Sequence, residues 1–183
     1  MVQSVGKTVR TPRGFTLVEL VVGLTILGVL FAIALPSYSS FVAEQALAAE
    51  ARRLAEAVSL ARSEAIKRNG FVVVCAGPAA AGCSPDAAWH EGWTMFEDRD
   101  GNAELDPSDP LIGAERRAST GVSIAGNAPV DHYLRFNYVG MARTVTGALQ
   151  MGTFEVCRSG YKAWRVVLAN SGRARLERGA SCA

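Results

Sequence analysis

A single carboxylate, Glu19, lies in a run of 21 residues, 15–35, that otherwise carries no charge. An ionised carboxylate inside an apolar membrane helix costs about 2.5–3.5 kcal/mol even on lenient insertion scales, so a chain that keeps one there uses it with a specific partner. Gly14 lies directly before the run. Cleavage after Gly14 would make Phe15 a charged amino terminus one helical turn from Glu19. We therefore expect an ion pair between this new amino group and Glu19, within one chain or between neighbouring subunits.

The second set of residues that could do chemistry is the four cysteines, Cys75, Cys83, Cys157 and Cys182. In an oxidising compartment they would form disulfides, and four cysteines allow three connectivities. We favour the local solution, Cys75–Cys83 and Cys157–Cys182, because each bond then closes one loop. Zinc binding is the rival interpretation. It has little support, because no Cys-x-x-Cys occurs and neither His90 nor His132 has a cysteine close in sequence.

An acidic segment follows between residues 86 and 109, with eight acids and one base. Its oxygen-bearing side chains fall at positions 1, 3, 5, 7, 9 and 12 of an EF-hand-like count: Asp98, Asp100, Asn102, Glu104, Asp106 and Asp109. The EF-hand glycine is replaced by Ala103, and prolines stiffen the exit. We predict a solvated hairpin tip whose Asp and Asn residues serve turn geometry, with weak calcium binding through Asp98, Asp100 and Asn102 as the alternative.

The charge reverses in the last 26 residues, 158–183, which hold six bases and one acid. Alternate residues of a strand share a face, so Arg173 and Arg175 would present two guanidinium groups about 7 Å apart, close to the phosphate repeat of a nucleic acid strand. Arg178 would join them only across a bend. Two interpretations stay open: contact with double-stranded DNA, and a soluble face or a partner for acidic loops of a neighbouring subunit.

An enzymatic function has no support in the sequence. His90 and His132 lie in no local motif that pairs a histidine with a nucleophile, and no Gly-x-Ser-x-Gly elbow or phosphate-binding glycine loop occurs. Cysteines in disulfides are not nucleophiles. We expect no catalytic residues and no cofactor.

The apolar run 15–35 is long enough to cross a membrane as a helix of about 30 Å. Lys7, Arg10 and Arg13 precede it, and positive residues before a span hold the short N-terminus in the cytoplasm. Two alternatives compete: a secretory signal peptide cut after Ala34, and an uncleaved single-span anchor. The first leaves the internal charge unexplained, and the second explains neither Gly14 nor Glu19. The chain of 183 residues then has room for one further domain.

Helical periodicity continues from residue 37 to residue 69. One apolar stripe has spacings of three and four residues: Leu47, Ala51, Leu54, Val58, Ala61 and Ala65. We expect this stripe to pack on the chain's own sheet, with a filament contact as the alternative. Pro36 should bend the helix rather than end it, and Gly70 should supply the left-handed residue that stops it.

From Phe71 onward the pattern is that of strands. Short β-branched, aromatic or alternating runs are separated mostly by Gly, Pro, Asn or Asp, and they fall at 71–75, 92–96, 111–117, 122–125, 133–138, 149–157, 163–168 and 174–178. The fold class expected is α+β: a long N-terminal membrane-spanning helix followed by an antiparallel β globular head.

Residues 13–20 read Arg-Gly-Phe-Thr-Leu-Val-Glu-Leu and resemble the class III signal of type IV pilins and type II secretion pseudopilins. The resemblance implies cleavage between Gly14 and Phe15 by a prepilin peptidase and methylation of the new amine. It also implies that Glu19 pairs with the amino terminus of the adjacent subunit during filament assembly.

Two segments of the head resemble the GspH/FimT family of minor pseudopilins and minor pilins: Gly92-Trp93 with the turns that follow it, and Trp164-Arg165-Val166-Val167 leading to Gly172-Arg173. In FimT-like proteins a Gly-Arg-x-Arg element is implicated in DNA binding, and residues 172–175 match it.

The resemblance implies a structural subunit that initiates or caps a type IV pilus or a type II secretion pseudopilus. Its partners would be other pilins, the peptidase, the inner membrane and, in the alternative, DNA. The expected organisation is a leader at 1–14, a transmembrane helix at 15–35, an amphipathic helix at 36–70 and a β-rich periplasmic head at 71–183.

Overall fold

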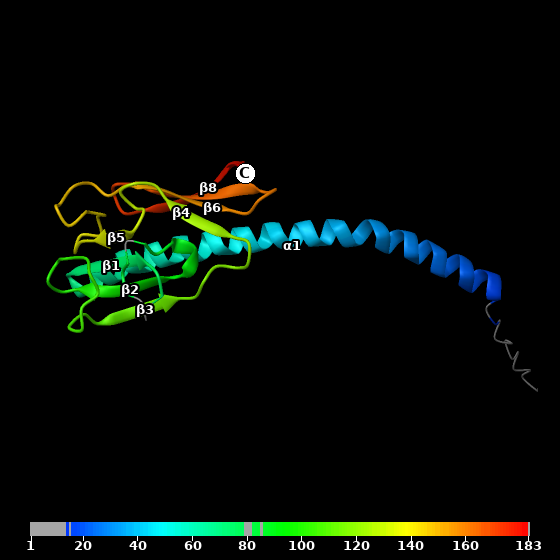
Figure 1. Ribbon diagram of the computed structural model, residues 1–183, viewed down its shortest axis with the longest axis horizontal. Coiled ribbons are helices and arrows are strands. Elements are labelled where there is room, and N and C mark those ends of the chain that lie inside the picture. The colour runs from blue at the N-terminus through cyan, green and yellow to red at the C-terminus, as the bar shows by residue number, and fades with distance from the viewer. Residues whose placement is uncertain (1–13, 15, 79–81, 85, 183) are drawn as a thin grey trace, which may run out of the picture. The chain divides into compact units, whose positions relative to one another are not determined.

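The computed structural model describes residue 14 and residues 16–78, 82–84 and 86–182 (Figure 1). The chain divides into two compact units, residues 1–42 and residues 43–183. We call the second the globular unit and describe the two separately.

One helix, α1 (Leu17–Arg68), contains 52 residues and passes through Pro36 without interruption. Thr16 caps its start, because its hydroxyl accepts a hydrogen bond of 3.3 Å from the Glu19 backbone N–H. At the other end Asn69, not Gly70, takes the left-handed conformation, with φ of 51°. The prediction for Gly70 was therefore wrong by one residue. Asparagine tolerates this conformation because its short polar side chain can hydrogen-bond locally.

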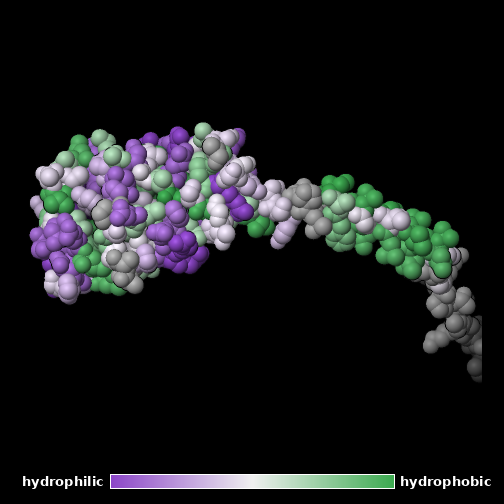
Figure 2. Space-filling model, viewed as in Figure 1, coloured by the Kyte–Doolittle hydropathy of each residue, from purple (hydrophilic) through white to green (hydrophobic). Residues whose placement is uncertain are grey.

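The N-terminal half of α1 exposes its apolar side chains. From Leu17 to Ile33 the large hydrophobic residues are 48–79% exposed. This helix is the one candidate membrane span among the described residues, by length and composition. Figure 2 shows this stretch as mainly hydrophobic surface. Such a surface needs lipid or other protein to cover it.

The second half of α1 packs into the globular unit through the predicted stripe. All six stripe residues are at most 1% exposed: Leu47, Ala51, Leu54, Val58, Ala61 and Ala65. In the last turn Arg68 donates to Glu64 at 2.8 Å and to Glu97 at 2.7 Å. These hydrogen bonds lower the pKa of both carboxyls. The stripe prediction is confirmed, and the head is the surface that covers it.

Eight strands form two antiparallel sheets. The first sheet has the order β3-β2-β1-β5, from β1 (Phe71–Ala76), β2 (Trp93–Asp98), β3 (Leu111–Glu115) and β5 (Tyr133–Phe136). The second has the order β4-β6-β7-β8, from β4 (Ser123–Gly126), β6 (Gly152–Cys157), β7 (Lys162–Leu168) and β8 (Ala174–Ser181). A short 3₁₀ helix, η1 (Trp89–Glu91), precedes β2. Each strand overlaps one of the eight predicted runs, and the α+β prediction is confirmed.

Both sheets contribute to one core together with α1 (Figure 1). Trp89 is buried in this core, edge-on to Phe154 with ring centroids 4.9 Å apart. Its indole N–H donates to the Asp131 carbonyl at 2.7 Å, which satisfies the only polar atom of a buried ring. The core therefore joins the two sheets to the second half of α1.

Two disulfides tie loops to strands, Cys75–Cys83 and Cys157–Cys182. This is the local pairing that the sequence favours. The second bond joins the end of β6 to the residue that follows β8, and the Cys182 N–H also donates to the Tyr161 carbonyl at 2.9 Å. The end of the basic segment that begins at residue 158 is thus held on the turn between β6 and β7.

Candidate functional site

The residues expected to act in processing lie before and within the first turn of α1. Gly14 is exposed, Phe15 lies outside the described residues, and Glu19 is exposed at the third position of the helix. An acidic side chain here is also favourable for the helix dipole. Glu19 therefore has a local role in the helix terminus beside the assembly role inferred from the sequence, and experiment must separate the two.

The acidic loop, residues 98–109, uses several of its side chains to build itself. Asp98 is 1% exposed and accepts from the Gly101 N–H at 2.8 Å, the Ala103 N–H at 3.3 Å and Arg135 Nε at 3.1 Å. Desolvation raises the pKa of the Asp98 carboxyl, and the backbone donors and Arg135 oppose that change. The most buried member of the proposed calcium set is thus already bonded.

The outer part of the acidic loop is held by hydrogen bonds from an amide. Asn102 Nδ2 donates to Asp100 at 2.9 Å and to Asp106 at 3.0 Å. In the part of the chain that the structure describes, no group of three or more His, Cys, Asp or Glu side chains is arranged to hold a metal ion. The geometry therefore favours the turn interpretation over the calcium interpretation for this loop.

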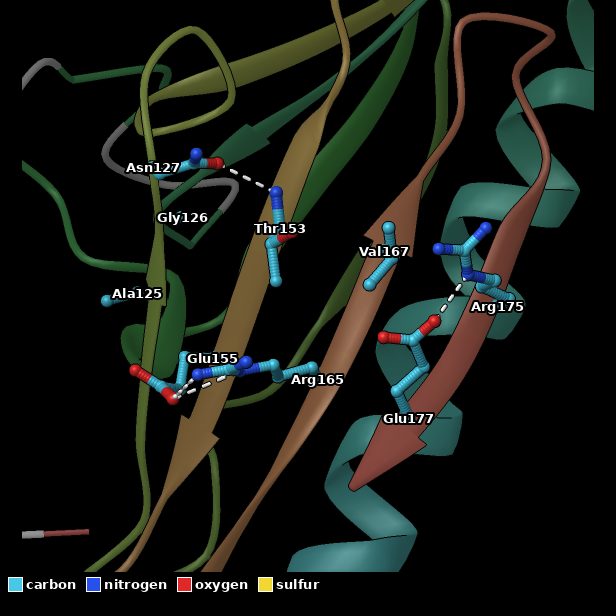
Figure 3. A pocket seen from close by; sticks show the side chains of 9 residues that line it. All are labelled: Ala125, Gly126, Asn127, Thr153, Glu155, Arg165, Val167, Arg175 and Glu177. Carbon is cyan, nitrogen blue, oxygen red and sulfur yellow. Dashed lines mark hydrogen bonds and ion pairs between the residues drawn. The ribbon is translucent and has the colours of Figure 1, made fainter. Parts of the chain in front are cut away.

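The predicted basic strand, β8, lies at the edge of the second sheet. On the sheet face away from the core, a shallow groove of about 540 Å³ crosses β4, β6, β7 and β8 (Figure 3). Two arginines line it, and each is paired with a carboxylate: Arg165 with Glu155 at 3.3 Å, and Arg175 with Glu177 at 2.6 Å. The groove is polar but contains as many acidic as basic side chains.

Arg178 lies on the opposite face of β8 from Arg175. The register pairs it with Trp164, and its guanidinium lies 4.0 Å from the centre of that ring. Arg173 precedes the strand and is exposed. Two residues separate Arg175 from Arg178 in β8, so these two side chains lie on opposite faces of the strand. The structure therefore does not gather Arg173, Arg175 and Arg178 on one face.

Sequence reasoning missed the contribution of Arg165 and Glu155 to this face. Both lie at alternate positions of predicted strands, so the period of two could have placed each on a face. Their juxtaposition depends on the pairing of β6 with β7, in which Glu155 lies opposite Arg165. A single sequence does not give that register.

Both the N-terminal segment and the head match known protein families. Residues 10–35 match the prokaryotic N-terminal methylation motif. Residues 50–172, about two thirds of the chain, match the family described as type II transport protein GspH. This chain belongs to the GspH family. The resemblance noted in the sequence is confirmed, and the family is one of structural subunits, so the protein is not an enzyme.

One curated relative of this GspH-family chain is the pilin-like protein PilA1 of Thermus thermophilus. It is 36% identical over 176 residues, which cover 91% of this chain and 99% of the relative.

Solved structures share the fold at lower identity. The type IV minor pilin FimU of Pseudomonas aeruginosa has a TM-score of 0.57 at 19% identity, covering 78% of this chain and 99% of FimU. The minor pseudopilin EpsH of the Vibrio cholerae type II secretion system has a TM-score of 0.50 at 14% identity, covering 72% of this chain and 96% of EpsH. The protein is accordingly a minor pilin or pseudopilin of a type IV pilus or type II secretion system.

Proposed function

We propose that this protein initiates or caps a filament, after a prepilin peptidase has cut it between Gly14 and Phe15 and the new amine has been methylated. The observation that carries the filament role is the division of α1. Its second half is covered by the globular unit, whereas the large apolar residues from Leu17 to Ile33 are exposed. That surface fits a bilayer before assembly and the α1 helices of neighbouring subunits afterwards.

We also propose how the chain is oriented in the inner membrane. The basic leader, residues 1–14, stays in the cytoplasm, residues 15–35 cross the inner membrane, and the amphipathic helix 36–70 and the head 71–183 lie in the periplasm. The two disulfides suit that compartment, because the periplasm is oxidising. After assembly the subunit would be in a periplasmic filament or at the cell surface.

Filament counts test the initiating role. In cells that carry the filament machinery but lack this chain, we expect about tenfold fewer filaments of unchanged length, because an unfavourable nucleation step limits number rather than growth. Electron microscopy of filaments, with gold-labelled chain restored at native level, measures both quantities. An unchanged count, with label spread along the shaft, would contradict the proposal.

DNA binding is the second candidate function. It is favoured by the exposure of Arg175 on the edge strand β8 and of Arg173 directly before that strand, in the element 172–175 that resembles the DNA-binding element of FimT-like proteins. The carboxylate of Glu177 opposes it, because this group already pairs with Arg175 at 2.6 Å. DNA would therefore compete with an intramolecular partner.

That competition gives a sharp test on the detergent-solubilised full chain. If DNA binds, Arg173→Ala with Arg175→Ala should weaken binding about tenfold and reduce the slope of log affinity against log salt by about two, one for each lost phosphate contact. Glu177→Gln should tighten binding, since it releases Arg175. Fluorescence anisotropy of labelled duplex DNA across a salt series measures this. If the affinity for DNA does not change with salt concentration, or does not change in any of the three substitutions, the DNA function is excluded.

A further inference from the structure

A second groove in the globular unit, of about 270 Å³, lies between one side of α1 and the first sheet. Ala57 and Leu60 of α1, Trp93 and Met95 of β2, and Gly113 of β3 are among the residues that line it. Ala57, Trp93 and Met95 are at most 7% exposed, whereas Leu60 is 50% exposed. This helix–strand groove therefore combines buried apolar side chains with an exposed leucine.

Three buried hydrogen-bond donors belong to side chains that line this groove and have no acceptor. Among the described residues, the buried side-chain donors without a hydrogen bond are Trp93 Nε1, Arg53 Nε, Arg53 Nη1 and Trp164 Nε1, and the first three are at the groove. Arg53 Nε lies 3.9 Å from Glu115, which is beyond hydrogen-bond distance. Arg53 Nη2 already pairs with Glu50 at 2.8 Å. Because a buried donor without an acceptor is destabilising, a ligand that supplied an acceptor here would be favoured.

The strand that borders the groove, β3, has a free edge. It is the outermost strand of its sheet and, among the described strands, pairs only with β2 (Figure 1). The outer edge of such a strand keeps unpaired backbone N–H and C=O groups. Gly113 leaves space on the strand, because a Cβ at this position would meet nothing within 4 Å. Gly92, at φ of 112°, lies so close to the Glu115 carbonyl that a Cβ would collide with it, and this close approach places Trp93 beside β3.

The charges at the groove indicate which kind of acceptor fits. Glu56 and Glu115 also line it, and the charge of Arg53 is already matched by the buried Glu50. An anionic ligand would therefore face two carboxylates, whereas a backbone carbonyl carries no net charge. A groove between a helix and a free strand edge is also the geometry in which an extended peptide adds to a sheet. Main-chain hydrogen bonds to the edge then give affinity, and a pocket for a side chain gives specificity.

We propose that the helix–strand groove binds an extended segment of a different pilin subunit. The segment adds to the four-stranded sheet beside β3, places an apolar side chain next to Gly113 and Leu60, and presents a backbone carbonyl to Trp93 Nε1. The partner is an unlike subunit, because a chain that initiates or caps a filament must contact subunits other than its own copies. This inference rests on the proposed filament role and assigns a contact surface on the globular unit to it.

Photo-crosslinking from the groove tests the contact. In cells that make filaments, the tagged full chain carries Leu60→p-benzoylphenylalanine, and mass spectrometry identifies the cross-linked partner and the residues that it contributes. We expect a different subunit that has its own N-terminal methylation motif. The same replacement at Leu176, which is 37% exposed on the edge strand β8 of the other sheet, is the matched control and should not give this product. A cross-link from position 60 only to a second copy, to a protein without the motif or to lipid overturns the inference, as does the absence of any cross-link.

Filling the groove tests its geometry. Gly113→Leu in the cross-linking chain should lower the yield at least about tenfold, because the new side chain occupies the place of the partner's, and Gly113→Ala should lower it less than about twofold. Neither substitution crowds the chain itself, since a Cβ at Gly113 meets nothing within 4 Å. The denaturant midpoint of the full chain in detergent, followed by tryptophan fluorescence, should therefore stay unchanged. A yield that is the same with leucine as with glycine overturns the inference.

Filament counts separate this inference from the function on which it rests. If removal of the chain lowers the number of filaments but the Leu60 cross-link to an unlike subunit is absent, the inference fails and the initiating role stands. If removal leaves the number of filaments unchanged, the initiating role itself fails, and the inference that rests on it fails too.

Discussion

Glu19→Gln should almost abolish incorporation of the subunit into filaments while leaving its amount in the membrane unchanged. In the proposed assembly, the carboxylate pairs with the methylated amino terminus of Phe15 in the adjacent subunit, away from water. Removing one member of a buried ion pair leaves the other charge uncompensated, which costs about 3–5 kcal/mol. Quantitative immunoblots of purified filaments and of membranes measure the two pools.

The control for this prediction is Thr16→Val. It removes the hydroxyl that accepts from the Glu19 N–H at 3.3 Å and keeps the carboxylate. Loss of a helix cap costs about 1 kcal/mol, so incorporation should fall only slightly. Equal losses in the two variants would mean that Glu19 serves the helix terminus and not the contact between subunits.

Arg135→Ala should be the most destabilising single substitution that we predict in the globular unit. The Arg135 side chain is 7% exposed and its partner Asp98 is fully buried. Arg135 also donates to the Thr144 carbonyl at 3.2 Å and lies 3.7 Å from the centre of the Phe71 ring. Its loss leaves a buried carboxylate without a cation, and we expect the free energy of unfolding to fall by about 3–5 kcal/mol. Denaturant unfolding of the full chain in detergent, followed by tryptophan fluorescence, measures the change.

Arg165→Ala provides the comparison for Arg135→Ala. It breaks the ion pair between Arg165 and Glu155, in which the two side chains are 43% and 44% exposed. Exposed ion pairs contribute less than about 1 kcal/mol to the free energy of unfolding. Asp98→Asn combined with Arg135→Ala should recover part of the lost stability, because no charge is then buried alone. If both arginine variants lose the same stability, the Asp98–Arg135 pair does not hold the acidic loop as described.

Periodicity explains why much of the fold was predictable. The stripe from Leu47 to Ala65 and the eight strand-like runs can be read from spacing along the chain alone. This works because each face of such a helix or strand lies in a single environment, either the core or the solvent. Local pairing of Cys75 with Cys83 and of Cys157 with Cys182 needed no knowledge of the distant fold. These features are properties of neighbouring residues in the sequence.

The features that sequence reasoning missed depend on register and on local backbone energies. The burial of Asp98 follows from Arg135, 37 residues away, and the ion pair of Glu155 follows from strand pairing. The helix stop at Asn69 rather than Gly70 reflects a choice between two adjacent residues that both tolerate the left-handed region. A single sequence contains no direct signal for any of these.

The cleavage site underlies the whole account, because only cleavage after Gly14 places a charged amino terminus one turn from Glu19. Mass spectrometry of the N-terminal peptide of the mature protein, isolated from cells that contain prepilin peptidase, tests it directly. We predict a peptide that begins at Phe15 and has one methyl group on its amine. A mature chain that begins at Leu35, or an intact chain that begins at Met1, would contradict the account.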